Sequence, residues 1–270
     1  MSIFREVPPT AGFPLYWSDL FSLFKFGHDS ASLEDDFKKY LGVNFAEVAY
    51  SGTASFYFIL EGLKEISSNK AVIIPAFVCP LVPLAISRAG LKVEICDIQP
   101  DNFNFDYDAL EKLCAQNDVL AIVAVHLAGL AIDLDKLKSL AEKYGIFLIE
   151  DCAQSLGAEY KGKKIGTFGD FAFYSLCRGK GLTIYEGGVL VTKNEAHAKI
   201  IEEKKEKIAR EASFSETIKI LELFGYALLY RPFGFWFIFR LPQIFWKLQG
   251  NKLKAAIEEF DENFPLHRVS

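Results

Sequence analysis

The sequence lacks an apolar run long enough to cross a bilayer, a CxxC pair and an excess of positive charge. Its 5 cysteines stand singly, with no histidine at metal-ligand spacing, so we expect no metal site and a reducing compartment. The net charge of −5 argues against a nucleic-acid partner. The first 20 residues contain no apolar stretch followed by a small-residue cleavage site, so they do not resemble a secretory signal. These absences predict a cytoplasmic protein that acts on a small molecule or another protein.

What the sequence does contain is material for a large core, because 51% of its 270 residues are hydrophobic. From about Glu47 to Asn194, short β-branched runs alternate with helical patterns, which predicts an α/β fold with a mainly parallel sheet and helices on both faces. The expected strands are 72–75, 93–98, 120–126, 147–151, 171–176 and 189–192. The expected helices are 55–66, 83–89, 107–115 and 133–144, the last with Asp133 as its N-cap.

Polar residues cluster where three of the expected strands end. His126 follows AIVAV, Glu150 and Asp151 follow IFLI, and Ser175 ends FAFYS. In open α/β sheets, ligands bind beyond the carboxyl ends of the strands. We therefore expect one pocket at this edge.

The stretch FLIEDCAQSLGAEYKGKKIGTFGDFAFYSLCRGKGLTIYEGGVLVT, residues 147–192, is the most informative part of the chain. It resembles the central block of the DegT/DnrJ/EryC1/StrS aminotransferase family, enzymes that use pyridoxal 5'-phosphate (PLP) to make amino sugars. The resemblance extends through SGTAS at 51–55, VIIPAFVCP at 72–80 and HLAG at 126–129. Several spaced motifs together are far more specific than any one of them. The resemblance implies a fold type I, PLP-binding large domain over residues 1–195.

The resemblance places three residues around the cofactor ring. Lys180, in the glycine-flanked segment GKG, matches the lysine that binds PLP covalently and transfers protons. Asp151 matches the carboxylate that keeps the pyridine nitrogen protonated, although an N-cap or a turn is the ordinary role of such an acid. Gln154 matches an amide donor near the ring oxygen, with a surface glutamine as the alternative. Glu150 would point away from Asp151 on a strand, so we expect it to be structural.

The cofactor phosphate needs backbone amides at a helix start and nearby hydroxyl groups. Gly52 and Thr53 of SGTAS match this need, and Ser175 matches a second phosphate ligand in the family. His126 is expected to line the pocket or to be a structural histidine. Family members often stack an aromatic ring on the cofactor where this chain has Cys79, so Phe77 or His126 is expected to replace that contact.

After Thr192 the composition of the chain changes, first to a charged run and then to an aromatic stretch. We expect residues 196–270 to form a helical, aromatic-rich extension. The charged run 193–212 predicts a solvated helix face. The aromatic stretch 223–246 is too short between charges for a membrane span; it fits buried packing, a subunit contact or a peripheral membrane contact. The terminal FPLHRVS is similar to the segment that opens the family's small domain, so that domain is expected to be missing here.

The leading functional prediction is a PLP-dependent aminotransferase that moves an amino group from an amino acid donor to a keto-sugar, expected to be nucleotide-linked, within a homodimer. Lys180 argues against the family's dehydratases, which carry histidine at that position. A non-catalytic truncated homologue, acting as a binding or membrane-associated module, is the alternative. A nicotinamide-dependent oxidoreductase is disfavoured because no GxGxxG follows a first strand.

Overall fold

The protein was analysed as a computed structural model that describes residues 32–177, 179–184, 186–209, 221, 224–225, 227–250 and 264–266. These residues fall into two compact units. One unit contains residues 32–209 and 264–266, and the other contains the described residues from 221 to 250. The expectations for the first 20 residues and for the last four lie outside the described residues.

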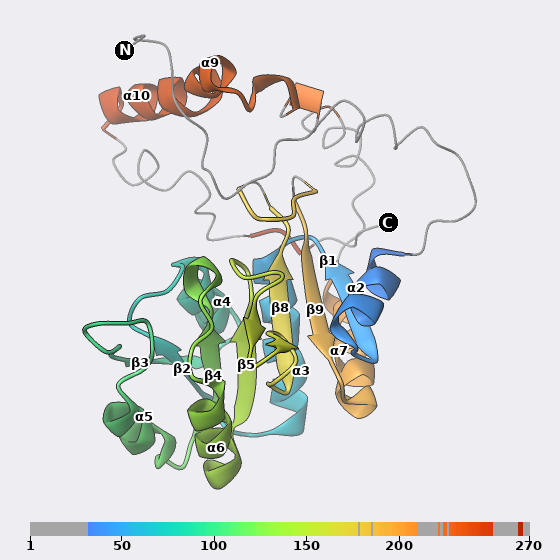
Figure 1. Ribbon diagram of the computed structural model, residues 1–270, viewed down its shortest axis with the longest axis vertical. Coiled ribbons are helices and arrows are strands. Elements are labelled where there is room, and N and C mark those ends of the chain that lie inside the picture. The colour runs from blue at the N-terminus through green and yellow to red at the C-terminus, as the bar shows by residue number, and fades with distance from the viewer. Residues whose placement is uncertain are drawn as a thin grey trace. The chain divides into compact units, whose positions relative to one another are not determined.

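A seven-stranded sheet with the order β1-β9-β8-β5-β4-β2-β3 forms the centre of the first unit (Figure 1). Strands β2, β3, β4, β5 and β8 pair in parallel, and β9 is antiparallel to both β1 and β8. The sheet is therefore mainly parallel, as predicted. The strands are β1 Phe45–Ala49, β2 Ala71–Pro75, β3 Lys92–Cys96, β4 Val119–Val125, β5 Phe147–Asp151, β8 Phe171–Ser175 and β9 Gly188–Thr192.

Helices cover both faces of the sheet, which explains why its inner strands are apolar throughout. The side chains of α2, α5 and α6 belong to one core cluster, and those of α3, α4 and α7 belong to the cluster on the opposite face. Every residue of β4 is buried between the two clusters. The helices are α2 Leu33–Leu41, α3 Gly52–Ile66, α4 Leu81–Arg88, α5 Tyr107–Cys114, α6 Leu134–Tyr144 and α7 Glu195–Ile208.

Strand β1 was not expected from the sequence. Its pattern FAEVA is short and only partly apolar, and Phe45 pairs with Thr192 of β9, far away along the chain. Such a strand is defined by its partner rather than by its own residues. A two-stranded hairpin, β6 Glu159–Tyr160 and β7 Lys163–Lys164, was not expected either.

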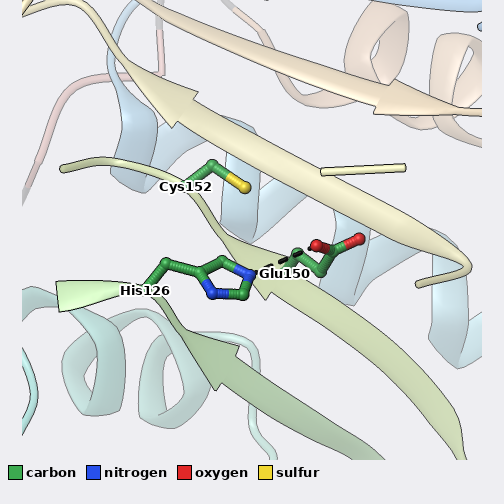
Figure 2. Close-up of side chains that lie close together, drawn as sticks. All are labelled: His126, Glu150 and Cys152. Atoms are coloured by element: carbon green, nitrogen blue, oxygen red, sulfur yellow. Dashed lines mark hydrogen bonds and ion pairs between the residues drawn. The ribbon is translucent and has the colours of Figure 1, made fainter. Parts of the chain in front are cut away.

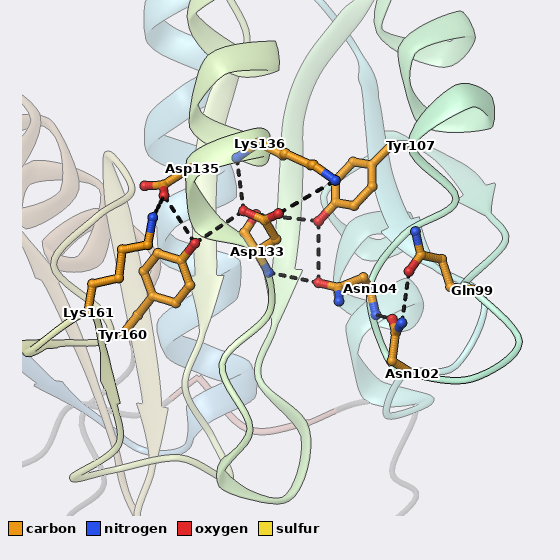
Figure 3. Close-up of polar contacts among 9 residues, drawn as sticks. All are labelled: Gln99, Asn102, Asn104, Tyr107, Asp133, Asp135, Lys136, Tyr160 and Lys161. Atoms are coloured by element: carbon orange, nitrogen blue, oxygen red, sulfur yellow. Dashed lines mark hydrogen bonds and ion pairs between the residues drawn. The ribbon is translucent and has the colours of Figure 1, made fainter.

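Side-chain caps fix where several helices begin. The Asp133 carboxylate accepts a hydrogen bond from the Lys136 backbone N–H at 3.2 Å, which confirms it as the N-cap of α6. The same carboxylate accepts from the Tyr160 hydroxyl at 3.2 Å, and the Asp133 N–H donates to Asn104 at 2.7 Å (Figure 3). The start of α6 is thus tied to the β6–β7 hairpin and to the loop before α5.

The charged run after Thr192 forms α7, and half of its residues are exposed, which gives the solvated helix face that was predicted. Its buried residues are Ala198 and Ile201. A Cβ added to Gly62 of α3 would lie 3.1 Å from Ile201, so the two helices are in close contact. Helix α7 therefore belongs to the α/β unit.

The described residues of the second unit form a nearly continuous helical run. It comprises α9 Pro232–Phe235, a π-turn over Trp236–Arg240 labelled η2, and α10 Leu241–Leu248. No helix in the described part of the chain combines the length and the apolar character that a bilayer span requires.

Candidate active site

Three neighbouring strands of the sheet, β4, β5 and β8, end at the same edge and are held in register there. The His126 backbone N–H donates to the Asp151 carbonyl at 3.1 Å, and the Cys152 N–H donates to the Phe173 carbonyl at 2.9 Å. Parallel strands bring their carboxyl ends together, so the polar residues after each strand lie near one another.

Asp151, the last residue of β5, is buried, with 5% of its surface exposed. Its carboxylate accepts one hydrogen bond from the Ala153 N–H at 3.0 Å. Burial raises the pKa of Asp151, and the positive charge of Lys180 opposes that rise. The carboxylate is therefore largely removed from water and makes no ion pair with any residue that the structure describes, so a cationic group placed beside it would be stabilised.

Glu150, on the other side of β5, is fully buried and accepts hydrogen bonds from a glycine-rich loop. Its two carboxylate oxygens accept from the backbone N–H groups of Gly166, Phe168 and Gly169, each at 2.7 Å. The His126 Nε2 atom lies 3.2 Å from the same carboxylate (Figure 2). Glu150 therefore joins the end of β4 to the loop before β8, and the prediction of a structural role is supported.

His126 is buried with both ring nitrogens engaged. Its Nδ1 atom accepts from the Ile132 N–H at 3.4 Å, which leaves the proton on Nε2 for Glu150. Cys152 lies beside this pair, and the three ligand atoms of His126, Glu150 and Cys152 come within 4.8 Å of one another. Burial raises the pKa of the Cys152 thiol well above its usual range. His126 and Glu150 thus form a buried hydrogen-bonded pair with Cys152 beside it. His126 was expected either to line the pocket or to be a structural histidine.

Gln154 lies on the exposed segment after β5. Its amide oxygen accepts from the Ala128 N–H at 3.1 Å. Ala128 has a φ of 51°, a left-handed conformation that alanine rarely adopts. Gln154 thus supports the turn after β4. Its side-chain NH2 group can donate a hydrogen bond to a ligand.

The N-terminus of α3 reaches the same sheet edge. The Ser51 hydroxyl accepts from the Ala54 N–H at 3.1 Å, so Ser51 is the N-cap, and the Gly52 and Thr53 amides stand in the first turn, where backbone N–H groups have no partner within the helix. A Cβ on Gly52 would lie 2.9 Å from that of Ser175. This close approach brings Gly52, Thr53 and Ser175 together, as the sequence analysis expected.

Gly188, the first residue of β9, permits this approach, because a Cβ there would overlap the carbonyl group of Ser51. We expect Gly188→Ala to lower the free energy of unfolding by roughly 1–3 kcal/mol, since backbone must move to admit the methyl group. Chemical denaturation of both proteins measures the change. Gly181→Ala is the matched control, because a Cβ at Gly181 meets nothing within 4 Å. Equal losses in the two variants would contradict the tight packing.

Lys180 lies on the loop between β8 and β9, and its side chain is partly exposed. The Lys180 backbone N–H donates to the Cys177 carbonyl at 3.3 Å, which closes a tight turn. Gly179 within that turn has a φ of 77°, which favours glycine strongly. Leu176 anchors the base of the loop, because its carbonyl accepts from the Ile184 N–H at 3.0 Å and its N–H donates to Gly187 at 2.8 Å. The glycine-flanked turn that the sequence predicted is present.

Cys79 comes near this group, whereas Phe77 has a different neighbour. Partial burial raises the pKa of the Cys79 thiol. The thiol lies close enough to Asp151 and Lys180 that their charges also affect its pKa. Phe77 is 60% exposed and stacks on Phe103, with 6.2 Å between ring centroids. Replacement of the family's stacking ring by Phe77 or His126 stays a prediction.

Ser51 and the backbone turn at Ala128 were not among the predicted site residues. A serine directly before a helical pattern is a recognisable N-cap signal, so Ser51 could have been predicted from SGTAS. The left-handed Ala128 could not, because its conformation depends on a hydrogen bond that its N–H donates to Gln154, which follows the neighbouring strand β5.

Known proteins resemble this chain over most of its length. Residues 21–227 match the DegT/DnrJ/EryC1/StrS aminotransferase family. The UDP-4-amino-4,6-dideoxy-N-acetyl-beta-L-altrosamine transaminase of Campylobacter jejuni is 36% identical over 166 residues, which cover 60% of this chain and 43% of that protein. The L-glutamine:2-deoxy-scyllo-inosose aminotransferase of Streptomyces kanamyceticus is 38% identical over 154 residues, covering 57% and 36%. This chain thus spans less than half the length of these curated relatives.

A solved structure confirms the fold. The putative sugar aminotransferase of Streptococcus pneumoniae, in its PLP form, aligns with a TM-score of 0.64 and 26% identity, over 73% of this chain and 56% of that one. The matched family region includes the whole sheet and the loop that carries Lys180. Sequence and architecture therefore agree, and the chain belongs to the DegT/DnrJ/EryC1/StrS aminotransferase family.

Proposed function

We propose that the α/β unit binds PLP at the carboxyl ends of β4, β5 and β8 and transfers an amino group from an amino acid to the ketone of a sugar, nucleotide-linked as in the Campylobacter jejuni relative. The observation that carries this proposal is that buried Asp151 ends β5 while Lys180 follows β8, the strand paired with β5, so both come from the same end of the sheet. Asp151 is a buried carboxylate that makes no ion pair with any residue the structure describes, and Lys180 is an amine on a loop whose base is fixed at Leu176.

The residues at this edge fit the three parts of the cofactor. Asp151 would hold the protonated pyridine nitrogen, because that cation would supply a countercharge to the buried carboxylate. Gln154 has an amide donor for the ring oxygen. The first-turn amides of α3 at Gly52 and Thr53, together with the Ser175 hydroxyl, would bind the phosphate. When bound, the cofactor supplies an aldehyde and an electron-accepting ring.

Lys180 would then have two tasks. Its amine would anchor the cofactor covalently, and after release it would carry a proton between the substrate carbon and the cofactor. The turn around Gly179 suits both tasks, because the side chain can reach the pocket from a loop whose base is fixed at Leu176. The amino donor is a free amino acid; glutamine is the donor named for the Streptomyces relative, and glutamate is the simplest alternative.

A half-reaction assay with the Asp151→Asn variant tests this function. The wild-type chain, loaded with PLP and mixed with glutamate or glutamine, should release the matching 2-oxo acid and show a change in cofactor absorbance. Asp151→Asn should slow this step by about 100-fold or more, because a neutral amide cannot hold the ring nitrogen protonated. Asp135→Asn is the matched control, because Asp135 lies on the exposed start of α6. A wild-type chain that binds PLP yet transfers no amino group would favour the non-catalytic alternative.

We also propose that the protein is a cytoplasmic homodimer. Cys79, Cys96, Cys114 and Cys152 are thiols and not halves of a disulfide, which supports a reducing compartment. The resemblance to the family supports the dimer, and light scattering on the preparations used for the assay would give the mass in solution.

A further inference from the structure

The helical run α9–η2–α10 carries a stripe of exposed, large apolar side chains along one side. The exposed side chains recur at steps of three or four residues, which is the spacing of one helix face. Phe233 is 65% exposed, Phe245 58% and Leu248 82%. The complete stripe comprises Phe233, Phe237, Leu241, Ile244, Phe245 and Leu248. We call these six residues the apolar stripe.

The opposite side of the run is already occupied within its own unit. Phe235 is buried, stacks on Phe239 with 4.9 Å between ring centroids, and contacts the ring of Tyr230 at 5.2 Å. The run therefore has one face that packs internally and one apolar face that remains exposed. An exposed apolar face of this length is typical of a binding surface.

Basic residues accompany the stripe along the described run. Residues 227–250 contain three basic side chains, Arg231, Arg240 and Lys247, and no aspartate or glutamate, in a chain whose net charge is −5. Arg240 and Lys247 are exposed within the run, and Arg231 is exposed at its start. The described run is therefore positively charged, and its partner should be negatively charged.

We propose that the apolar stripe and its basic residues bind the surface of a membrane that contains anionic lipid. A helix with an apolar face of phenylalanine and leucine, bordered by arginine and lysine, lies in the plane of the lipid headgroups. The run from Pro232 to Leu248 contains Arg240 near its middle and Lys247 near its end, and it is shorter than the roughly 20 apolar residues typical of a membrane span, which suits a position on the bilayer surface. A second copy of the chain fits less well, because a symmetric contact would bring two positively charged segments together.

Flotation of the full chain with lipid vesicles tests this proposal. The chain should float with vesicles of phosphatidylcholine and phosphatidylserine, bind far less to phosphatidylcholine alone, and lose binding as salt is raised, because salt screens the charges. Replacing Arg240 and Lys247 with glutamine should weaken binding to the mixed vesicles by roughly 30-fold. Replacing Phe233 and Phe245 with serine should weaken binding by about tenfold or more.

The matched control replaces Ile95 and Leu130 with serine, since these side chains are 63% and 59% exposed in the α/β unit. This control should bind vesicles like the wild type. Circular dichroism checks that all variants remain folded. The proposal is overturned if the wild type does not bind the anionic vesicles, or if the stripe variants bind them as tightly as the control does. Self-association that the stripe variants abolish, without vesicle binding, would assign the stripe to a second copy instead.

Discussion

Lys180→Ala should remove covalent binding of PLP and lower amino transfer by roughly 1,000-fold or more, since the anchor and the proton carrier are lost together. The side chain is partly exposed on a loop, so the substitution should leave the fold intact. Borohydride reduction of the loaded wild-type chain, followed by peptide mapping, should place the reduced cofactor on the peptide that contains Lys180. The variant should carry none after the same treatment.

Lys163→Ala is the matched control for this experiment, because Lys163 is a lysine on the exposed β6–β7 hairpin. Its labelling and its rate should equal those of the wild type. Addition of methylamine to Lys180→Ala should restore part of the rate, which a purely structural role of the lysine would not allow. Reduced cofactor spread over surface lysines, or unchanged transfer by Lys180→Ala, would contradict the assignment.

Glu150→Ala should lower the free energy of unfolding by about 3–5 kcal/mol, because several buried donors would lose their acceptor and each such loss costs about 1–3 kcal/mol. The substitution would leave three backbone N–H groups of the 166–169 loop and the His126 ring without their acceptor. Chemical denaturation followed by circular dichroism measures the loss.

Glu142→Ala provides the comparison for Glu150, because Glu142 is an exposed glutamate whose ion pair with Lys138 spans 3.9 Å on the surface of α6. Surface pairs of this kind contribute at most about 1 kcal/mol. A loss below about 1 kcal/mol for Glu150→Ala would show that the network is not needed for the fold. A large loss would also give the glycine-rich segment KIGTFGD a structural role. Its backbone amides bind Glu150 and so hold the end of β5, on which Asp151 lies.

The sequence by itself was sufficient for the class of fold and for most of the sheet. Strands buried on both faces must be apolar throughout, and surface helices must place an apolar residue at every third or fourth position. Both requirements produce patterns that can be recognised within a short segment of sequence. Strands β2, β4, β5, β8 and β9 and the N-cap at Asp133 were predicted on that basis. The strand end at Asp151 and the glycine turn at Lys180 were also predicted, because a strand end and a turn are local features, whereas the roles of the two residues were implied by the family resemblance.

The tertiary structure alone decided the features that depend on residues far apart in the chain. Strand β1 exists because β9 lies beside it, and the carboxylate of Glu150 is satisfied by amides 16 to 19 residues further along. Gly52 and Gly188 are required because two backbones approach each other across the site, not because of any turn in their own segments. Hydrogen bonds and close packing between distant segments have no local periodicity, so one sequence contains no pattern from which they can be predicted.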